Sequence, residues 1–224
     1  MHRGAVAYSL RLGLLAACVL AACACGASAK PLSGEYSLSP GNRYVTDEFE
    51  PALTFEVGNG WELTDGLQQK PFFELSREYQ GGDRFVVISF NNPPSRVSDP
   101  NNPDKLVPAP KDWVSWFQGH PHLEVSEPRP TSVGGVRGRR FDTKVSALPE
   151  DYHSEDCLGM GVPLWPLPQG HHWCGDEGRP SRTIVLDGIE DETVIIDVYT
   201  GTEIFEKGVS QAQKVLDTVE WEGA

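Results

Sequence analysis

Apolar and polar residues alternate along much of the chain, and a period of two is typical of β-strands with one buried face. The pattern begins at 53–57, resumes at 61–63 after a Gly-Asn-Gly turn, and returns at 73–75. Residues 85–90 read Phe-Val-Val-Ile-Ser-Phe, apolar on both sides, which predicts a strand in the middle of a sheet. Together these segments predict an antiparallel meander.

The second half of the chain shows the same alternation. Residues 131–145 pass through a Gly-Gly pair, which predicts two strands joined by a tight turn. The apolar runs at 183–186 and 193–199 flank the acidic segment 187–192, and we expect them to pair as a hairpin.

Two segments have helical spacing instead. The aromatic residues of 113–117 follow Asp112, a good N-cap, and precede Gly119, which predicts a short helix with one aromatic face. A second helix is expected at 210–218, close to the end of the chain. Its apolar side consists of Val209, Ala212, Leu216 and Val219. Strands with one short and one terminal helix predict an α+β domain.

Two proline-rich stretches, 91–110 and 146–180, interrupt the pattern. Proline lacks an amide hydrogen and disrupts helices and inner strands, so we expect 91–110 to be a long exposed loop. The second stretch is expected to be an insertion with an extended segment at 162–168. This insertion either folds over the core or presents Trp165 and Trp173 to a ligand or partner.

The N-terminal segment has the pattern of a bacterial export signal that ends in a lipidation site. The uncharged run 12–22 follows Arg11 and is too short to form a stable membrane anchor. It leads into Leu-Ala-Ala-Cys, which has the form of a lipobox. We therefore expect 1–22 to be a lipoprotein signal peptide and Cys23 to carry the lipid that holds the protein at a membrane.

Two alternative processing sites compete with this assignment. Cys18 ends a similar sequence but leaves a short apolar run, whereas cleavage after Ala29 by ordinary signal peptidase would release the protein without lipid. Residues 23–42 are rich in small residues and proline, and we expect them to form a flexible tether. The remaining residues, 43–224, are expected to form a single domain.

The cysteines of this domain predict a disulfide, and its net charge excludes some classes of binding partner. Cys157 and Cys174 are the two cysteines beyond the tether, and export to an oxidising compartment makes a disulfide between them the simplest expectation. The state of Cys25 is left open. The formal net charge of −13 argues against nucleic acid, and against anionic lipid as a partner of the folded surface.

The segment 150–179 concentrates histidine, cysteine and carboxylate side chains, which are ligands of zinc and copper. Its candidate metal ligands are His153, His171 and His172, although their spacing matches no known metal motif. The chain contains no G-x-S-x-G, phosphate-loop or H-E-x-x-H motif. We therefore assign no catalytic residues and expect neither catalytic activity nor a bound cofactor.

The order of these pieces resembles the PsbP-like proteins, which include a photosystem II extrinsic subunit and several families of bacterial lipoproteins. The resemblance is carried by Phe-Glu-Val at 55–57 with Gly-Trp at 60–61, and by Val-Gly-Gly-Val-Arg-Gly at 133–138. It continues at 195–198 and through the terminal segment 212–221, Ala-Gln-Lys-Val-Leu-Asp-Thr-Val-Glu-Trp.

The resemblance extends from about Tyr44 to Trp221 and implies an antiparallel sheet flanked by helices, an α/β/α sandwich. It also implies a binding or assembly accessory, because such proteins are mostly not enzymes. We therefore expect a lipid-anchored extracytoplasmic lipoprotein that binds an envelope protein or a small ligand. The alternative is metal binding or metal delivery through the loop 150–179.

Overall fold

The computed structural model describes residues 28–79, 85–149, 152, 157, 161–168, 170–190 and 192–223, with 65–68 described by their backbone alone. Strands form most of this structure, and its two α-helices are short. None of the helices in the described part of the chain is long and apolar enough to cross a membrane. The signal peptide, Cys23 and Cys25 lie outside the described residues.

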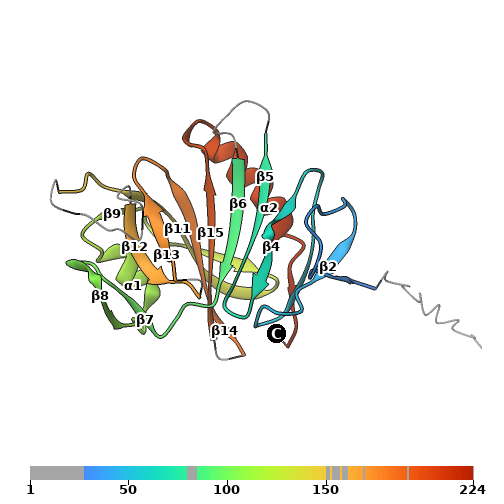
Figure 1. Ribbon diagram of the computed structural model, residues 1–224, viewed down its shortest axis with the longest axis horizontal. Helices are drawn as coiled ribbons and strands as arrows, with labels where there is room; N and C mark the ends of the chain where they lie inside the picture. The colour runs from blue at the N-terminus through green and yellow to red at the C-terminus, as the bar shows by residue number, and fades with distance from the viewer. Residues whose placement is uncertain are drawn as a thin grey trace, which may run out of the picture.

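The largest element is an open antiparallel sheet, in which the strand order is β10-β11-β14-β15-β6-β5-β4 and β9 also pairs with β11 (Figure 1). Its strands are β4 (Glu62–Gln69), β5 (Phe72–Glu78), β6 (Phe85–Asn91), β9 (Leu123–Val125), β10 (Arg129–Val133), β11 (Val136–Val145), β14 (Ser181–Ile189) and β15 (Glu192–Thr200). The apolar strand expected at 85–90 is β6, which lies between β5 and β15. The expected hairpin is β14–β15, and its strands are longer than predicted.

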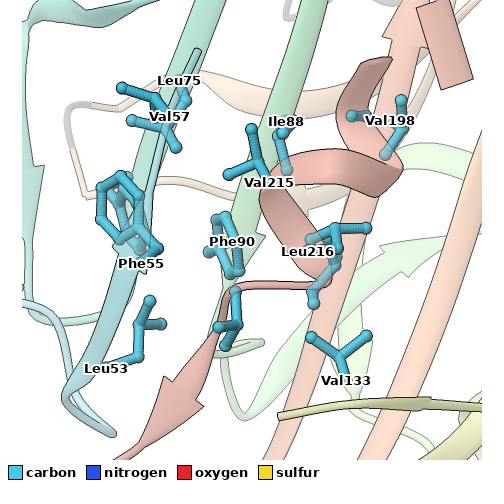
Figure 2. Packing of buried hydrophobic residues seen from close by; sticks show 14 of the residues in the cluster. Leu53, Phe55, Val57, Leu75, Ile88, Phe90, Val133, Val198, Val215 and Leu216 are labelled. Atoms are coloured by element: carbon cyan, nitrogen blue, oxygen red, sulfur yellow. The ribbon is translucent and has the colours of Figure 1, made fainter. Parts of the chain in front are cut away.

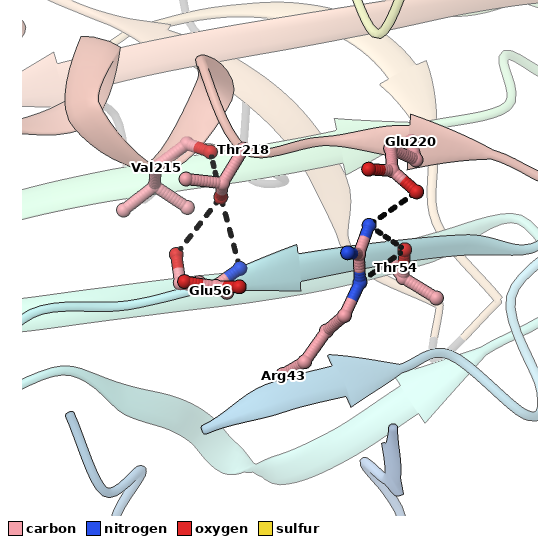
Figure 3. Close-up of polar contacts among 6 residues, drawn as sticks. All are labelled: Arg43, Thr54, Glu56, Val215, Thr218 and Glu220. Atoms are coloured by element: carbon pink, nitrogen blue, oxygen red, sulfur yellow. Dashed lines mark hydrogen bonds and ion pairs between the residues drawn. The ribbon is translucent and has the colours of Figure 1, made fainter. Parts of the chain in front are cut away.

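A second, smaller sheet contains β1 (Lys30–Pro31), β2 (Arg43–Val45), β3 (Leu53–Glu56) and β16 (Glu220–Trp221). Figure 3 shows how polar contacts join its strands to the end of the chain. The Arg43 guanidinium pairs with Glu220 and donates to the Thr54 hydroxyl at 3.0 Å. The Glu56 amide donates to the Thr218 hydroxyl at 2.9 Å.

The expected tether at 23–42 is partly folded onto this small sheet. Strand β1 pairs with β2, and the side chains of Leu32 and Leu38 are buried. The Leu38 amide donates to the Trp61 carbonyl at 2.9 Å. Two isolated leucines therefore anchor a segment whose small residues and prolines predict flexibility, and the folded region begins before residue 43.

One face of the large sheet packs against the terminal helix. This helix, α2 (Phe205–Leu216), follows a 3₁₀ turn (Thr202–Ile204) and begins five residues before the predicted start. Gly208 explains the difference, because a Cβ there would lie 2.4 Å from Thr200, so this first turn approaches β15 through a glycine rather than an apolar side chain. Figure 2 shows Val215 and Leu216 of α2 among Ile88, Phe90 and Val198 of the sheet.

The opposite face of the large sheet is covered by three smaller elements. They are grouped on the left in Figure 1, whereas the small sheet with β2 lies on the right. They are α1 (Trp113–Gln118), the hairpin of β7 (Arg96–Asp99) and β8 (Asn102–Pro108), and the hairpin of β12 (Gly161–Pro166) and β13 (His172–Asp176). The predicted helix α1 is present, with the Asp112 carboxylate accepting from the Ser115 amide at 3.0 Å. Trp113 and Phe117 are its buried residues.

The prediction that 91–110 is a long exposed loop is wrong, because β7 and β8 form a ribbon whose Val97 is fully buried. The prolines remain compatible with this ribbon. A two-stranded sheet leaves one side of each strand unpaired, so Pro103 and Pro108 of β8 are tolerated without a donor there. Pro100 lies at the turn between the two strands.

Candidate functional site

A cavity of about 510 Å³ lies between the second face of the large sheet and the β12–β13 hairpin. Its described lining comes from strands β4, β5, β9, β11, β14 and β15, from the hairpin and the loop that joins its strands, from Arg179, and from Phe117 of α1. This volume is within the range of small-molecule binding sites, roughly 300–1,000 Å³. Apolar and aromatic side chains contribute much of the lining, with a few polar groups among them.

The strand register places a polar row across the middle of this face. Glu74 of β5 pairs with Ser89 of β6, Ser89 pairs with Asp197 of β15, and Asp197 pairs with Thr183 of β14. Directly paired residues on adjacent strands point to the same face of a sheet. The apolar neighbours of Asp197 along β15, Ile196 and Val198, belong to the core against α2, so alternation directs Asp197 toward the cavity side.

Asp197 is the most unusual residue of the site, because it places an ionisable carboxyl group at a buried position in the cavity lining. The Thr183 hydroxyl donates to its Oδ1 at 2.6 Å, and Oδ2 is buried with no hydrogen-bond partner of normal geometry among the described residues. Burial raises the pKa of Asp197 to about 7, although the Thr183 hydroxyl and the Trp173 side chain act in the opposite direction. The carboxyl group therefore titrates near neutral pH.

A second carboxyl group, that of Glu74, lines the same cavity. The Tyr199 hydroxyl donates to Glu74 Oε1 at 2.9 Å. Burial raises the pKa of Tyr199 well above its usual value, and the carboxylates of Glu74, Asp176 and Asp197 raise it further. Tyr199 thus remains a neutral donor that orients Glu74.

The two tryptophans of the insertion pair across the hairpin, with ring centroids 6.4 Å apart, but they differ in exposure. Trp165 is 1% exposed, and its ring centroid lies 5.8 Å from that of Trp113, so it belongs to the core. Trp173 is half-buried and lines the cavity, with its ring centroid 5.6 Å from Tyr199 and 6.1 Å from Phe72. Of the two candidate contact residues, Trp173 is therefore the one at the cavity, and the β12–β13 hairpin of the insertion folds over the core.

A disulfide holds the hairpin that covers the cavity. Cys157 and Cys174 are bonded as predicted, with an S–S distance of 2.00 Å. Cys174 lies in β13, and the isolated bridge between Val145 and Glu177 joins the end of this strand to β11. The disulfide thus links the hairpin to the segment before it, while the bridge to β11 and the buried side chains of β12, among them Val162 and Trp165, hold the hairpin against the rest of the domain.

The predicted metal ligands are only partly brought together. His171 and His172 both line the cavity, whereas His153 lies outside the described residues. Within the described part of the chain, no group of three or more His, Cys, Asp or Glu side chains has a geometry that could hold a metal ion. The disulfide also leaves Cys157 and Cys174 without a thiolate to offer.

Arg179 and Lys144 belong to the described lining of the cavity, but neither is a buried, unpaired cation. Arg179 pairs with Asp176 at 3.1 Å, and its guanidinium lies 5.4 Å from the centre of the Phe85 ring. Lys144 is exposed to solvent. The deeply buried charged group of the described lining is consequently the acidic Asp197.

Neither Asp197 nor Glu74 is among the site residues predicted from the sequence. A signal for both exists, because each interrupts an apolar strand: Asp197 within Val-Ile-Ile-Asp-Val-Tyr at 194–199, and Glu74 within Phe-Phe-Glu-Leu at 72–75. A charged residue at a position buried on both sides is uncommon and requires compensation or a function. Only the register shows that the two carboxyls line one cavity.

Comparison with models of known protein families gives no match, and comparison with curated proteins gives none either. The resemblance to PsbP-like proteins therefore stays a prediction. Conclusions about this chain depend on its own residues and geometry.

Proposed function

We propose that this protein is a binding protein of the cell envelope that takes a small ligand into the cavity beneath the β12–β13 hairpin. The observation that carries the proposal is a ligand-sized cavity with a fully buried carboxyl group in its lining. An apolar pocket with a few convergent polar groups and a group of strongly shifted pKa is the usual form of a binding site.

Binding without catalysis is the better interpretation of the carboxyl groups. Glu74 and Asp197 belong to β5 and β15, and β6 lies between these strands. Their backbones are therefore two strand spacings apart, about 10 Å. Glu74 accepts a hydrogen bond from the Tyr199 hydroxyl, and Asp197 accepts one from the Thr183 hydroxyl, which is buried together with it.

The location and fold family in this proposal come from the sequence. The lipobox at 20–23 supports export and a lipid anchor at Cys23, and the disulfide fits an oxidising compartment. A β-rich antiparallel domain with a terminal helix against the sheet is compatible with the PsbP-like α/β/α arrangement. Metabolic labelling with an alkyne fatty acid tests the anchor, and label that persists in a Cys23→Ala variant would refute it.

Metal binding is the second candidate, and the observation in its favour is that His171 and His172 line the same cavity. Titration of the oxidised protein with zinc and with copper tests it directly. A dedicated site would bind with a Kd tighter than about 1 μM. Weaker binding, or binding unchanged in a His171→Ala/His172→Ala variant, would exclude this role.

The cavity proposal is tested with the neutral apolar fluorophore N-phenyl-1-naphthylamine. We expect saturable binding of one probe per protein. Replacing Leu167, which lines the cavity, by Trp should fill the space and weaken binding at least about tenfold, because the probe and the new ring compete for one volume. The control is Leu106→Trp, on β8 and away from the described lining. Absence of binding, or equal binding by both variants, would contradict the proposal.

A further inference from the structure

The cavity combines a buried carboxyl group, two partly exposed ones and several aromatic rings, and this combination indicates the chemical class of its ligand. We propose that the ligand is an organic cation, a protonated amine carried on an apolar or aromatic body, with its ammonium group against Asp197 and its body against Trp173. The inference deepens the proposed function and depends on it.

Asp197 supplies a buried carboxyl oxygen, near the Trp173 side chain, that could accept a further hydrogen bond. Its Oδ2 is buried without a hydrogen-bond partner of normal geometry among the described residues, while Thr183 occupies Oδ1. A buried acceptor left without a donor is unfavourable, and an ammonium group offers up to three donors. A hydrogen bond between an ammonium and a carboxylate is also among the stronger polar contacts in proteins.

Aromatic side chains lie next to this acceptor. Trp173 contacts Tyr199 and Phe72, with ring centroids 5.6 and 6.1 Å away, and all three rings line the cavity. The faces of aromatic rings attract cations, and Trp does so most strongly. The same rings provide apolar surface for the body of the ligand.

The charges around the cavity disfavour an anion. The carboxyl groups of Glu74, Asp176 and Asp197 all line it, whereas Arg179 is paired with Asp176 and Lys144 is exposed. The chain as a whole carries a formal net charge of −13, which attracts cations to the surface. An anionic ligand would have to approach a buried carboxyl group without a deeply buried basic partner.

The pH dependence of binding follows from the same geometry. The other titratable or charged groups of the described lining come from every element around Asp197: Glu74 on β5, Lys144 on β11, Tyr199 on β15, His171, His172 and Asp176 of the hairpin, and Arg179 after it. Burial holds the pKa of Asp197 at about 7, and the cation binds to the ionised form. The affinity for a cation that stays protonated should therefore fall about tenfold between pH 8 and pH 6, because the bound cation must first displace a proton.

The test uses three compounds of similar shape that compete with N-phenyl-1-naphthylamine for the purified protein at pH 8. These are phenethylamine, which is a cation, 2-phenylethanol, which is neutral, and 3-phenylpropanoate, which is an anion. We expect phenethylamine to bind about tenfold or more tightly than 2-phenylethanol, with 3-phenylpropanoate weakest. Asp197→Asn should remove the preference for the amine, so that phenethylamine and 2-phenylethanol bind with similar affinity.

Asp187→Asn is the matched control, since Asp187 is an exposed carboxylate on β14 outside the described cavity lining. This variant should keep the preference for the amine. Equal or tighter binding of the alcohol or the propanoate would overturn the inference and leave the cavity proposal intact. A preference for the amine that persists in Asp197→Asn would also overturn it. Failure of the fluorophore itself to bind would instead overturn the proposed function.

Discussion

The two faces of the large sheet are built from the same strands and have opposite characters. The face against α2 is an apolar core in which side chains such as Phe90 and Ile196 are fully buried. The other face carries Ser89 and Asp197 at its centre and encloses a cavity. Because side chains alternate along a strand, one face can be closed by packing while the other keeps polar groups for a ligand.

The elements that cover the two faces differ in the same way. Helix α2 packs closely enough that Gly208 has no space for a side chain. The β12–β13 hairpin lies over the cavity and is secured by the Cys157–Cys174 disulfide. Close packing stabilises one side, whereas the other side combines a second apolar cluster, which includes Trp165 and Ile195, with a disulfide and a cavity.

The largest expected effect comes from adjacent residues of β6 that face opposite sides. Phe90→Ala should lower the free energy of unfolding by about 3–5 kcal/mol, because it leaves a void beside Phe73, whose ring centroid lies 4.6 Å away. Ser89→Ala is the matched control and should cost about 1 kcal/mol, since the Ser89 hydroxyl accepts one hydrogen bond, from Asn91. Urea unfolding measures both. Equal losses would contradict the difference between the faces.

Removal of the disulfide should have the next largest effect. The bond joins residues separated by 17 positions, so Cys157→Ala/Cys174→Ala should lose about 3 kcal/mol of stability in the chain-entropy account. We also expect weaker binding of N-phenyl-1-naphthylamine, because the hairpin forms the cavity roof. Unfolding and probe titration are measured on the same sample. A variant with unchanged probe affinity would show that the hairpin is held by its apolar contacts alone.

A smaller, pH-dependent effect is expected at Asp197. Its pKa is raised from 3.8 to about 7, so the folded protein binds a proton that the unfolded chain releases, and stability falls as the pH rises through this interval. Between pH 5 and pH 8 this group should cost about 2–3 kcal/mol. In the Asp197→Asn variant, the free energy of unfolding should not show this loss between pH 5 and pH 8.

The measurement for Asp197 is urea unfolding at pH 5, 6, 7 and 8, with the difference between wild type and variant as the readout. Other groups titrate in this range, and the difference removes their contribution. Asp187→Asn should follow the wild-type profile. A wild-type stability that declines no more steeply than that of Asp197→Asn would refute a buried, neutral carboxyl group at this position.

The sequence predicts well those helices and strands that depend on local signals. Helix α1 is an example, because Asp112, the aromatic spacing and Gly119 are all local signals. The segment 91–110 is the opposite case, since its prolines hide a ribbon that forms through pairing and through burial of Val97. The start of α2 was also missed, because Gly208 has a role that depends on the distance to Thr200.

The sequence by itself determined the central strand at 85–90, the hairpin of β14 and β15, the presence of the two helices and the pairing of Cys157 with Cys174. These features depend on short-range periodicity, on capping residues and on the number of available cysteines. Tertiary structure alone decided that Trp165 is buried whereas Trp173 lines a cavity. It also decided that Glu74 and Asp197, which are far apart along the chain, line one site. The physical reason is that the register between neighbouring strands sets which side chains share a face, and register depends on the packing of the whole sheet.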